Sequence, residues 1–224
     1  SHVTEICESA FDSCILKKID FTSNSELKLI GKNAFQNSKI KRIIIPRHVS
    51  IISEYSFYYT LCLKKIEFSN NSELKIIKEK AFFLSGIESI YIPDHVKQIN
   101  EFAFGHCRSL KRIHFGEKSE ICSIGEGAFS FSVVEKIEIP KMVKKIEKES
   151  FQFCDNLKCV EFLGDVIYID DCCFDNCKNL LIISFPNTFK LTVCLHSFQL
   201  ENIANKTALF VQPYLQIFVN EQRK

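Results

Sequence analysis

The sequence predicts an α/β repeat solenoid. Three observations predict it: a recurring phenylalanine, a small residue before it and an apolar pattern around it. The phenylalanine returns at intervals of 22 to 25 residues. Such self-similarity is typical of stacked repeats, in which each unit buries its apolar side against the next. The nine occurrences are Phe11, Phe35, Phe57, Phe82, Phe104, Phe129, Phe151, Phe174 and Phe198.

A long form of the repeat is clearest around Phe104. From Ile113 to Phe115 apolar and polar residues alternate, which is the period of a β-strand. The spacing therefore predicts a strand from which Arg112 and His114 point outward. Equivalent strands of successive units would form a parallel sheet. The apolar positions of this unit are Val96, Ile99, Ala103, Cys107, Leu110, Ile113 and Phe115.

A short form alternates with the long form in the middle of the chain and ends in a proline, at Pro46, Pro93 and Pro140. Proline has no N–H for a sheet ladder, so each is expected at the end of a strand. Long and short units together repeat every 47 residues, and the sequence of residues 24–28 returns at 71–75. Duplication of a two-unit block explains this period.

The Val-x-x-Ile segment before each phenylalanine is expected to carry the chain back along the opposite face. We expect turns or short helical pieces there. The small residue directly before each phenylalanine is alanine, serine or cysteine. A residue of this size should let the next coil approach closely.

Residues 1–198 are expected to form the solenoid, with about nine repeats, and residues 199–224 a last strand at 208–211 and a C-terminal cap at 213–218. The sequence begins inside a repeat, because Val3 aligns with Val49. We therefore expect a truncated N-terminus. Its uncapped first coil would expose an apolar edge, which favours self-association.

Charge is nearly balanced, at 29 basic and 27 acidic residues. This balance gives no bulk attraction to nucleic acid or to an anionic membrane, so neither is expected as a partner. No apolar run approaches the roughly 18 residues that span a membrane. No signal-peptide pattern occurs in this sequence.

The eleven cysteines are an odd number without regular pair spacing, which argues against a disulfide framework. Four of them stand third after a repeat phenylalanine, where other units have serine or threonine. We expect small, buried, reduced side chains there that bond to a turn. The cluster at 172–177 lacks paired C-x-x-C spacing, so zinc is not expected. The four are Cys14, Cys107, Cys154 and Cys177.

Motifs of enzymes and cofactor sites are missing: there is no phosphate-binding glycine loop, no H-E-x-x-H and no nucleophile elbow. His48 and His95 share one repeat position two coils apart, too far to share a metal, so both are expected in loops. Asp170, Asp171 and Asp175 are expected to be solvated turn residues. We therefore expect no catalytic residue, cofactor or metal.

Outward residues of the predicted strands form two columns, with rungs about 4.8 Å apart. A basic column beside a partly acidic one favours solubility and adds ~0.2–1 kcal/mol per cross-strand pair. In the middle of the sheet, apolar and aromatic residues interrupt the acidic column beside basic ones. An exposed aromatic next to arginine is typical of recognition sites for proteins or glycans. The predicted partner-binding residues are Ile44, Lys65, Tyr91, Arg112 and His114.

The repeat resembles the BspA-like branch of the leucine-rich-repeat superfamily, known from surface proteins of bacteria and parasitic protists. The resemblance implies a leucine-rich-repeat horseshoe with the parallel sheet on the concave face and short helical turns on the convex face. Many members are implicated in adhesion. It rests on Leu110-x-x-Ile113-x-Phe115, Ile43-x-Ile45-Pro46, Val96-x-x-Ile99 and Ala103-Phe104-x-x-Cys107, with equivalents along residues 3–198.

Together these observations predict a non-enzymatic recognition module, a protein- or glycan-binding segment of an adhesin-like protein at the cell surface or secreted. Two alternatives stay open: a structural spacer or self-assembling scaffold, and an intracellular protein–protein interaction module. Unpaired thiols favour the intracellular module. Two N-x-S/T sequons, at Asn70 and Asn205, favour a secreted chain.

Overall fold

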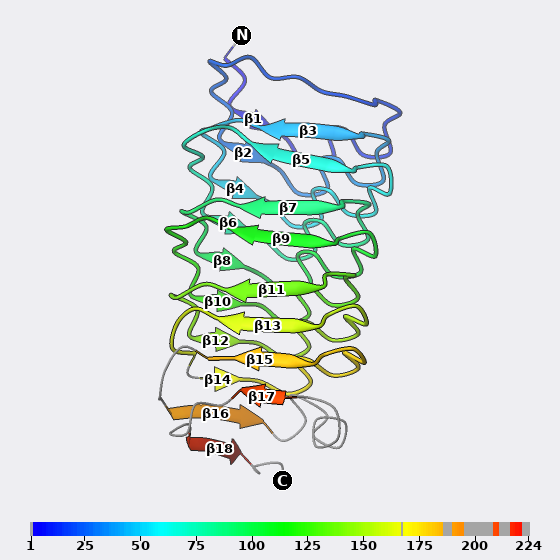
Figure 1. Cartoon of the computed structure of the whole chain (residues 1–224). Coiled ribbons are helices and arrows are strands. Elements are labelled where there is room, and N and C mark those ends of the chain that lie inside the picture. The colour runs from blue at the N-terminus through cyan, green and yellow to red at the C-terminus, as the bar shows by residue number, and fades with distance from the viewer. Residues whose placement is uncertain (1, 167, 186–189, 195–207, 211–215, 221–224) are drawn as a thin grey trace.

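The computed structural model describes residues 2–166, 168–185, 190–194, 208–210 and 216–220. Its coils are stacked in a column, so that successive coils of the chain are neighbours in space (Figure 1). One face, called here the long-strand face, carries strands of three or four residues. They are β3 (Arg42–Ile45), β5 (Lys65–Phe68), β7 (Ser89–Ile92), β9 (Arg112–Phe115), β11 (Lys136–Ile139), β13 (Cys159–Phe162), β15 (Ile182–Ser184) and β17 (Ala208–Phe210).

Behind this face lies a ten-stranded parallel sheet, most of whose strands have only two residues. The predicted parallel solenoid is therefore confirmed, with a second sheet that the sequence did not predict. The proposed cap at 213–218 falls largely outside the described residues. The ten strands are β1 (Glu5–Ile6), β2 (Leu29–Ile30), β4 (Ile51–Ile52), β6 (Ile76–Ile77), β8 (Gln98–Ile99), β10 (Ser123–Ile124), β12 (Lys145–Ile146), β14 (Tyr168–Ile169), β16 (Lys190–Cys194) and β18 (Gln216–Asn220).

The prediction of short helical turns is wrong, because the described part of the chain contains strands and turns but no helix. Each phenylalanine instead lies in an arc of successive turns. The residues two before and two after it have φ between 49° and 59°, a left-handed conformation that interrupts an α-helix. Amides in the arc then donate to the next coil: Phe104 N to Ala128 O at 2.8 Å, and His106 N to Ser130 O at 2.8 Å.

The repeat phenylalanines form one continuous stack through the column. From Phe11 to Phe174, neighbouring ring centroids are 5.0–5.5 Å apart and ring planes differ by 2–17°. This spacing matches the separation of neighbouring strands, about 4.8 Å. Offset stacking adds roughly 0.5–1.5 kcal/mol per pair to the burial of the rings. The ninth phenylalanine, Phe198, lies outside the described residues.

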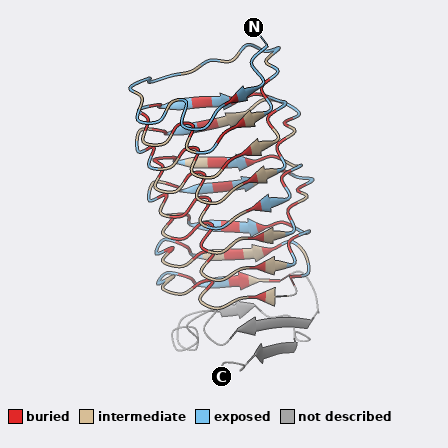
Figure 2. Cartoon of the chain, turned by 180° about the vertical axis from the view of Figure 1, so that it is seen from behind, coloured by how far each residue is buried: buried red, intermediate tan, exposed pale blue. Residues whose placement is uncertain are grey.

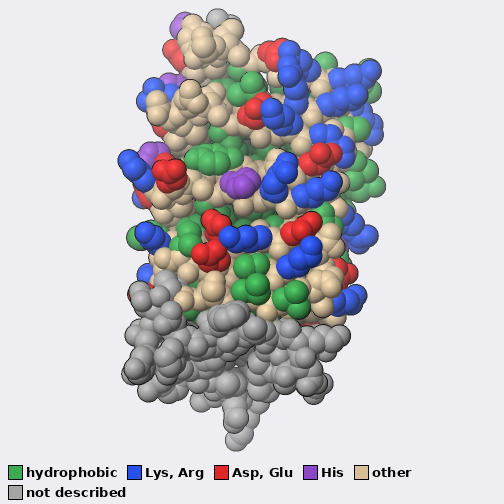
Figure 3. All heavy atoms as spheres, in the orientation of Figure 1, with side chains coloured by type: hydrophobic (Ala, Val, Ile, Leu, Met, Phe, Trp, Pro, Cys, Tyr) green, Lys and Arg blue, Asp and Glu red, His purple; other side chains and the backbone are tan. Residues whose placement is uncertain are grey.

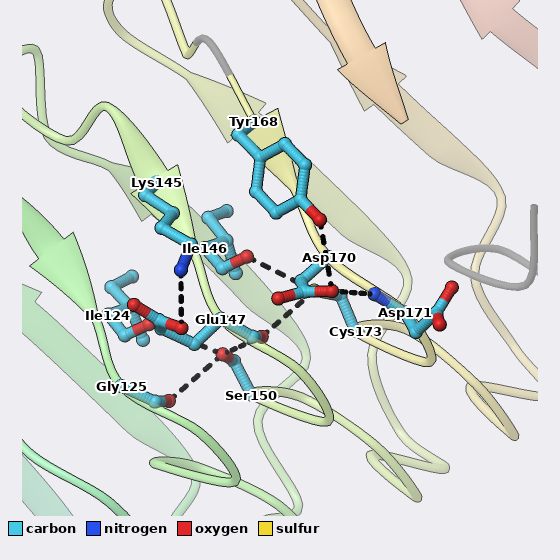
Figure 4. Close-up of polar contacts among 10 residues, drawn as sticks. All are labelled: Ile124, Gly125, Lys145, Ile146, Glu147, Ser150, Tyr168, Asp170, Asp171 and Cys173. Atoms are coloured by element: carbon cyan, nitrogen blue, oxygen red, sulfur yellow. Dashed lines mark hydrogen bonds and ion pairs between the residues drawn. The ribbon is translucent and has the colours of Figure 1, made fainter. Parts of the chain in front are cut away.

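From Ala34 to Cys173, the small residue before the repeat phenylalanine is buried between coils, as Figure 4 shows for Ser150 and Cys173. Ser150 Oγ donates to Gly125 O of the preceding coil at 3.0 Å, and Cys173 Sγ donates to Glu147 O at 3.0 Å. Both side chains are fully buried. Ser150 and Cys173 can replace alanine at this position because each remains small and finds an acceptor in the preceding coil. Ser56, at the same position, is small and buried, but its hydroxyl has no hydrogen-bond partner among the described residues.

Two of the four cysteines third after the phenylalanine, Cys107 and Cys154, are buried and bond to a turn, as predicted, whereas Cys14 and Cys177 are only half-buried. Cys107 Sγ donates to Phe82 O at 3.1 Å, and Cys154 Sγ donates to Phe129 O at 3.3 Å. Burial raises the pKa of Cys107 to about 12. The ten cysteines from Cys7 to Cys177 are free thiols. These side chains therefore act as small apolar groups with one weak hydrogen bond.

The two-unit block governs strand pairing on the long-strand face. Within a block, the strand of the short unit pairs with the next strand at four positions: β3 with β5, β7 with β9, and β11 with β13. Between blocks, β5 and β7 pair only at Lys65 and Ser89, and β9 shares no ladder with β11. The face is thus divided into two four-stranded sheets, β3-β5-β7-β9 and β11-β13-β15-β17.

Proline removes one hydrogen bond at each junction between these blocks. Within a block, the residue after the second strand donates to the end of the first, as Gly116 N does to Ile92 O at 2.9 Å. At the next junction the equivalent residue is Pro140, which has no N–H to give to Phe115 O. The last strand of one block and the first strand of the next therefore lack one backbone hydrogen bond that strands within a block have.

Replacing Phe104 with alanine should lower the free energy of unfolding by about 3–5 kcal/mol, because it empties a site inside the stack. Phe104 is 0% exposed, and its ring centroid lies 5.0 Å from that of Phe82 and 5.3 Å from that of Phe129. Urea denaturation measures the loss. Ile44→Ala, on the exposed face, is the control and should cost less than about 1 kcal/mol. A Phe104→Ala loss as small as that of the control would contradict the stack.

Thiol alkylation followed by mass spectrometry should separate two classes of cysteine. Cys7 and Cys122 are exposed and should react in the native protein, whereas Cys107 and Cys154 should react only in denaturant. The raised pKa of Cys107 keeps its thiol protonated at neutral pH, and burial blocks the reagent. Rapid native modification of Cys107, or a disulfide between Cys154 and Cys177, would contradict this assignment.

Candidate partner-binding site

The five predicted partner-binding residues all lie on the long-strand face, where buried and exposed residues alternate along each strand (Figure 2). Register places Tyr91 of β7 directly beside His114 of β9, and Arg112 is two residues before His114. Lys65 of β5 pairs with Ser89, two residues before Tyr91 on β7, and Ile44 lies one strand further away, on β3. The structure therefore groups Tyr91, Arg112 and His114, places Lys65 on the strand beside Tyr91 and leaves Ile44 farther off.

Ion pairs occupy most of the basic column, but not Arg112. Lys65 Nζ lies 2.8 Å from Glu67, and Lys136 Nζ lies 2.8 Å from Glu138 and 3.0 Å from Glu161. The bonds to Glu138 and Glu161 raise the pKa of Lys136. In the described part of the chain, Arg112 has no ion-pair partner. Its guanidinium is available to a ligand.

Tyr91 packs against the loop after β9. Burial, with the charges of Asp94 and Glu117, raises the pKa of the Tyr91 hydroxyl, so it remains a donor. A Cβ on Gly116 would lie 3.0 Å from this hydroxyl and overlap the Asp94 carboxylate. Asp94 Oδ1 in turn accepts from Lys118 N at 3.0 Å. Glycine at 116 therefore lets loop 116–119 fold onto Tyr91 and Asp94.

An open hollow of about 890 Å³ lies where β9 and β11 separate. Its walls are β9, loop 116–119, β11 and the turn at 140–142, with Leu163 at one end. The volume is within the roughly 300–1,000 Å³ of ligand sites. Met142 and Leu163 are 52% and 37% exposed and give it an apolar rim. On the same face, basic side chains gather toward the side where the long strands begin (Figure 3).

The sequence contained one signal for this hollow that was missed. Met142 occupies the repeat position of His48 and His95. These histidines lie in loops, as predicted, with Nδ1 3.1 Å from Glu73 and 2.8 Å from Glu120, respectively. The bonds from the histidines lower the pKa of both glutamates. In the third block an exposed methionine replaces this polar pair, beside the break in the sheet.

A second row of aromatic rings follows the turn arcs and was not predicted. Neighbouring centroids are 4.1–5.7 Å apart, and most of the rings stack face to face. All five are half-buried. Because the ring faces contact one another, few remain open to a ligand, and we assign this row to the stability of the arcs. Its members are Tyr58, Phe83, His106, Phe131 and Phe153.

The carboxylate of Asp170 accepts hydrogen bonds from residues near it in the sequence. Asp170 Oδ1 accepts from Tyr168 Oη at 3.3 Å and from Asp171 N at 2.7 Å (Figure 4), as expected for a turn residue. Among the residues described, no three His, Cys, Asp or Glu side chains are grouped to hold a metal ion. No helix of this part is long and apolar enough to cross a membrane.

The repeat sequence matches the BspA type leucine rich repeat region, in six copies, over residues 1–85 and 75–203. The chain belongs to this family. No curated protein matches the sequence. The BspA-type unit accounts for the apolar positions and stacked coils. The hollow arises where the chain departs from its own repeat, at Gly116 and Met142.

Three solved structures are similar to this chain at low sequence identity. A leucine-rich repeat protein from Bacteroides ovatus is 21% identical, with a TM-score of 0.60 over 97% of this chain and 66% of its own length. One from Eubacterium ventriosum is 23% identical, with a TM-score of 0.49 over 84% and 53%. The pneumococcal vaccine antigen PcpA is 17% identical, with a TM-score of 0.44 over 98% and 78%. At these identities the similarity concerns the fold alone.

Proposed function

We propose that this chain is a non-enzymatic recognition module of an adhesin-like protein and that the long-strand face over β7, β9 and β11 binds a protein or glycan partner. The observation that carries the proposal is the hollow beside an unpaired Arg112, with Tyr91 and His114 on its flank. The backbone of these residues is already fixed in strands, so binding a partner orders only their side chains. A spacer gains nothing from such a hollow.

The proposal includes a location at the cell surface or outside the cell. The exposed side chain of Asn70, in the turn after β5, supports it, because that sequon is accessible to glycosylation. Asn205, the second sequon, lies outside the described residues. A glycan mass on an Asn70 peptide from native material would support the location.

Immobilised protein should capture a partner from extracts of host-cell surfaces and matrix. Tyr91→Ala and Arg112→Ala should each weaken capture by about 1–2 kcal/mol, because each removes a central contact. Lys136→Ala should do less, since Glu138 and Glu161 already satisfy its charge. Binding of the purified partner, measured by calorimetry, gives the values.

Two variants serve as controls for these substitutions. Arg42→Ala removes an arginine from the same repeat position on β3, and Tyr59→Ala removes an exposed tyrosine from a turn arc. Both should bind normally and keep the stability of the wild type. If Tyr91→Ala and Arg112→Ala bind normally while Tyr59→Ala does not, the site is on the arcs. If nothing is captured, the chain is a spacer.

A further inference from the structure

The hollow between β9 and β11 carries an excess of unpaired positive charge. Its acidic residues Glu135 and Glu138 are paired, with Lys158 at 3.0 Å and Lys136 at 2.8 Å. Within the described residues, one acidic side chain of the lining, Glu117, has no ion pair. Four basic side chains of the lining also have none: Lys111, Arg112, Lys118 and Lys141. An anionic ligand therefore fits this surface.

The backbone beside the hollow includes polar groups that no sheet ladder uses. Gly116 N donates toward β7, and successive residues of a strand point to alternate sides. By this alternation, Ile113 O and the amide of Glu138 face one another where β9 and β11 share no ladder. The two strands remain neighbours in the column, so a ligand lies over the hollow and not between them as an added strand.

The rim adds an apolar component that a polyanionic sugar would leave unused. Met142 and Leu163 expose 52% and 37% of their surface on the far side of the hollow from Arg112's strand. An aliphatic side chain of a peptide would cover them and gain about 25 cal/mol per Å² of apolar surface removed from water. The positive charge and the apolar rim together match an acidic peptide that carries an aliphatic side chain.

We infer that the hollow between β9 and β11 binds an extended acidic peptide segment of the partner protein, with carboxylates at Arg112, Lys118 and Lys141 and an aliphatic side chain against Met142 and Leu163. This inference rests on the proposed function and names its ligand class.

The test uses fluorescein-labelled peptides and fluorescence anisotropy with the complete chain. The probe has glutamates on both sides of a central leucine pair. Matched peptides carry lysines in place of the glutamates, or glycines in place of the leucines. A heparin oligosaccharide represents anionic glycans. The acidic leucine peptide should bind best, and its affinity should fall as salt rises because exposed charges are screened.

Substitutions then place the peptide in the hollow. Arg112→Gln and Lys141→Gln should each weaken binding about five-fold, the upper end for an exposed ion pair. Arg42→Gln and Arg47→Gln change basic residues at the same two repeat positions outside the hollow, and both should bind as the wild type does. All four side chains are exposed, so the fold should persist; thermal denaturation checks this.

Several results would overturn the inference: equal binding of the lysine or glycine peptide, equal losses in the control variants, or binding of heparin in place of the peptide. If no peptide binds while Arg112→Ala still reduces capture from extracts, this inference fails and the proposed function stands. If Arg112→Ala affects neither assay, both fail.

Discussion

The contact between a repeat phenylalanine and the arc of the next coil sets the geometry of the whole column. Each ring stacks on its neighbours at 5.0–5.5 Å, and the amide of Phe104 donates to Ala128 O of the next arc. The ring contact and the hydrogen bond require nearly the same distance between neighbouring coils, so each coil is displaced from the one before it by the same distance along the column. Parallel strands follow on both faces of the column, because the strands at either end of each arc repeat at that step.

The long-strand face departs from this uniform rise because its units alternate in sequence. A proline after every second strand removes a donor that Gly116 and its equivalents provide elsewhere. The arcs hold the coils together across the gap, so the sheet can open at β9 and β11 without breaking the column. The hollow is therefore a surface feature that a continuous core supports, which is the arrangement a rigid binding site requires.

Periodicity and residue size made much of this structure predictable. The inward Phe104, the outward Arg112 and His114, and the buried Cys107 follow from local pattern alone. The prediction of helical turns was wrong, because Phe102 and Phe131 adopt positive φ, a conformation that only the neighbouring coils impose. The hollow was missed because the hydrogen bonds absent between β9 and β11 depend on how two coils lie side by side, which the pattern within one repeat does not show. Pro140 is visible in the sequence. The sequence does not show that the N–H missing at Pro140 would have faced Phe115 O on the neighbouring strand.

Native-state hydrogen exchange tests the central claim, that β9 and β11 share no ladder at the junction of two blocks while the strands within each block are paired. His114, Glu138 and Glu161 hold the same repeat position on β9, β11 and β13, and each amide faces the preceding strand. Two of these amides belong to a ladder, whereas that of Glu138 does not. The account predicts much faster exchange at Glu138 than at His114 or Glu161. Equal protection at all three would contradict it.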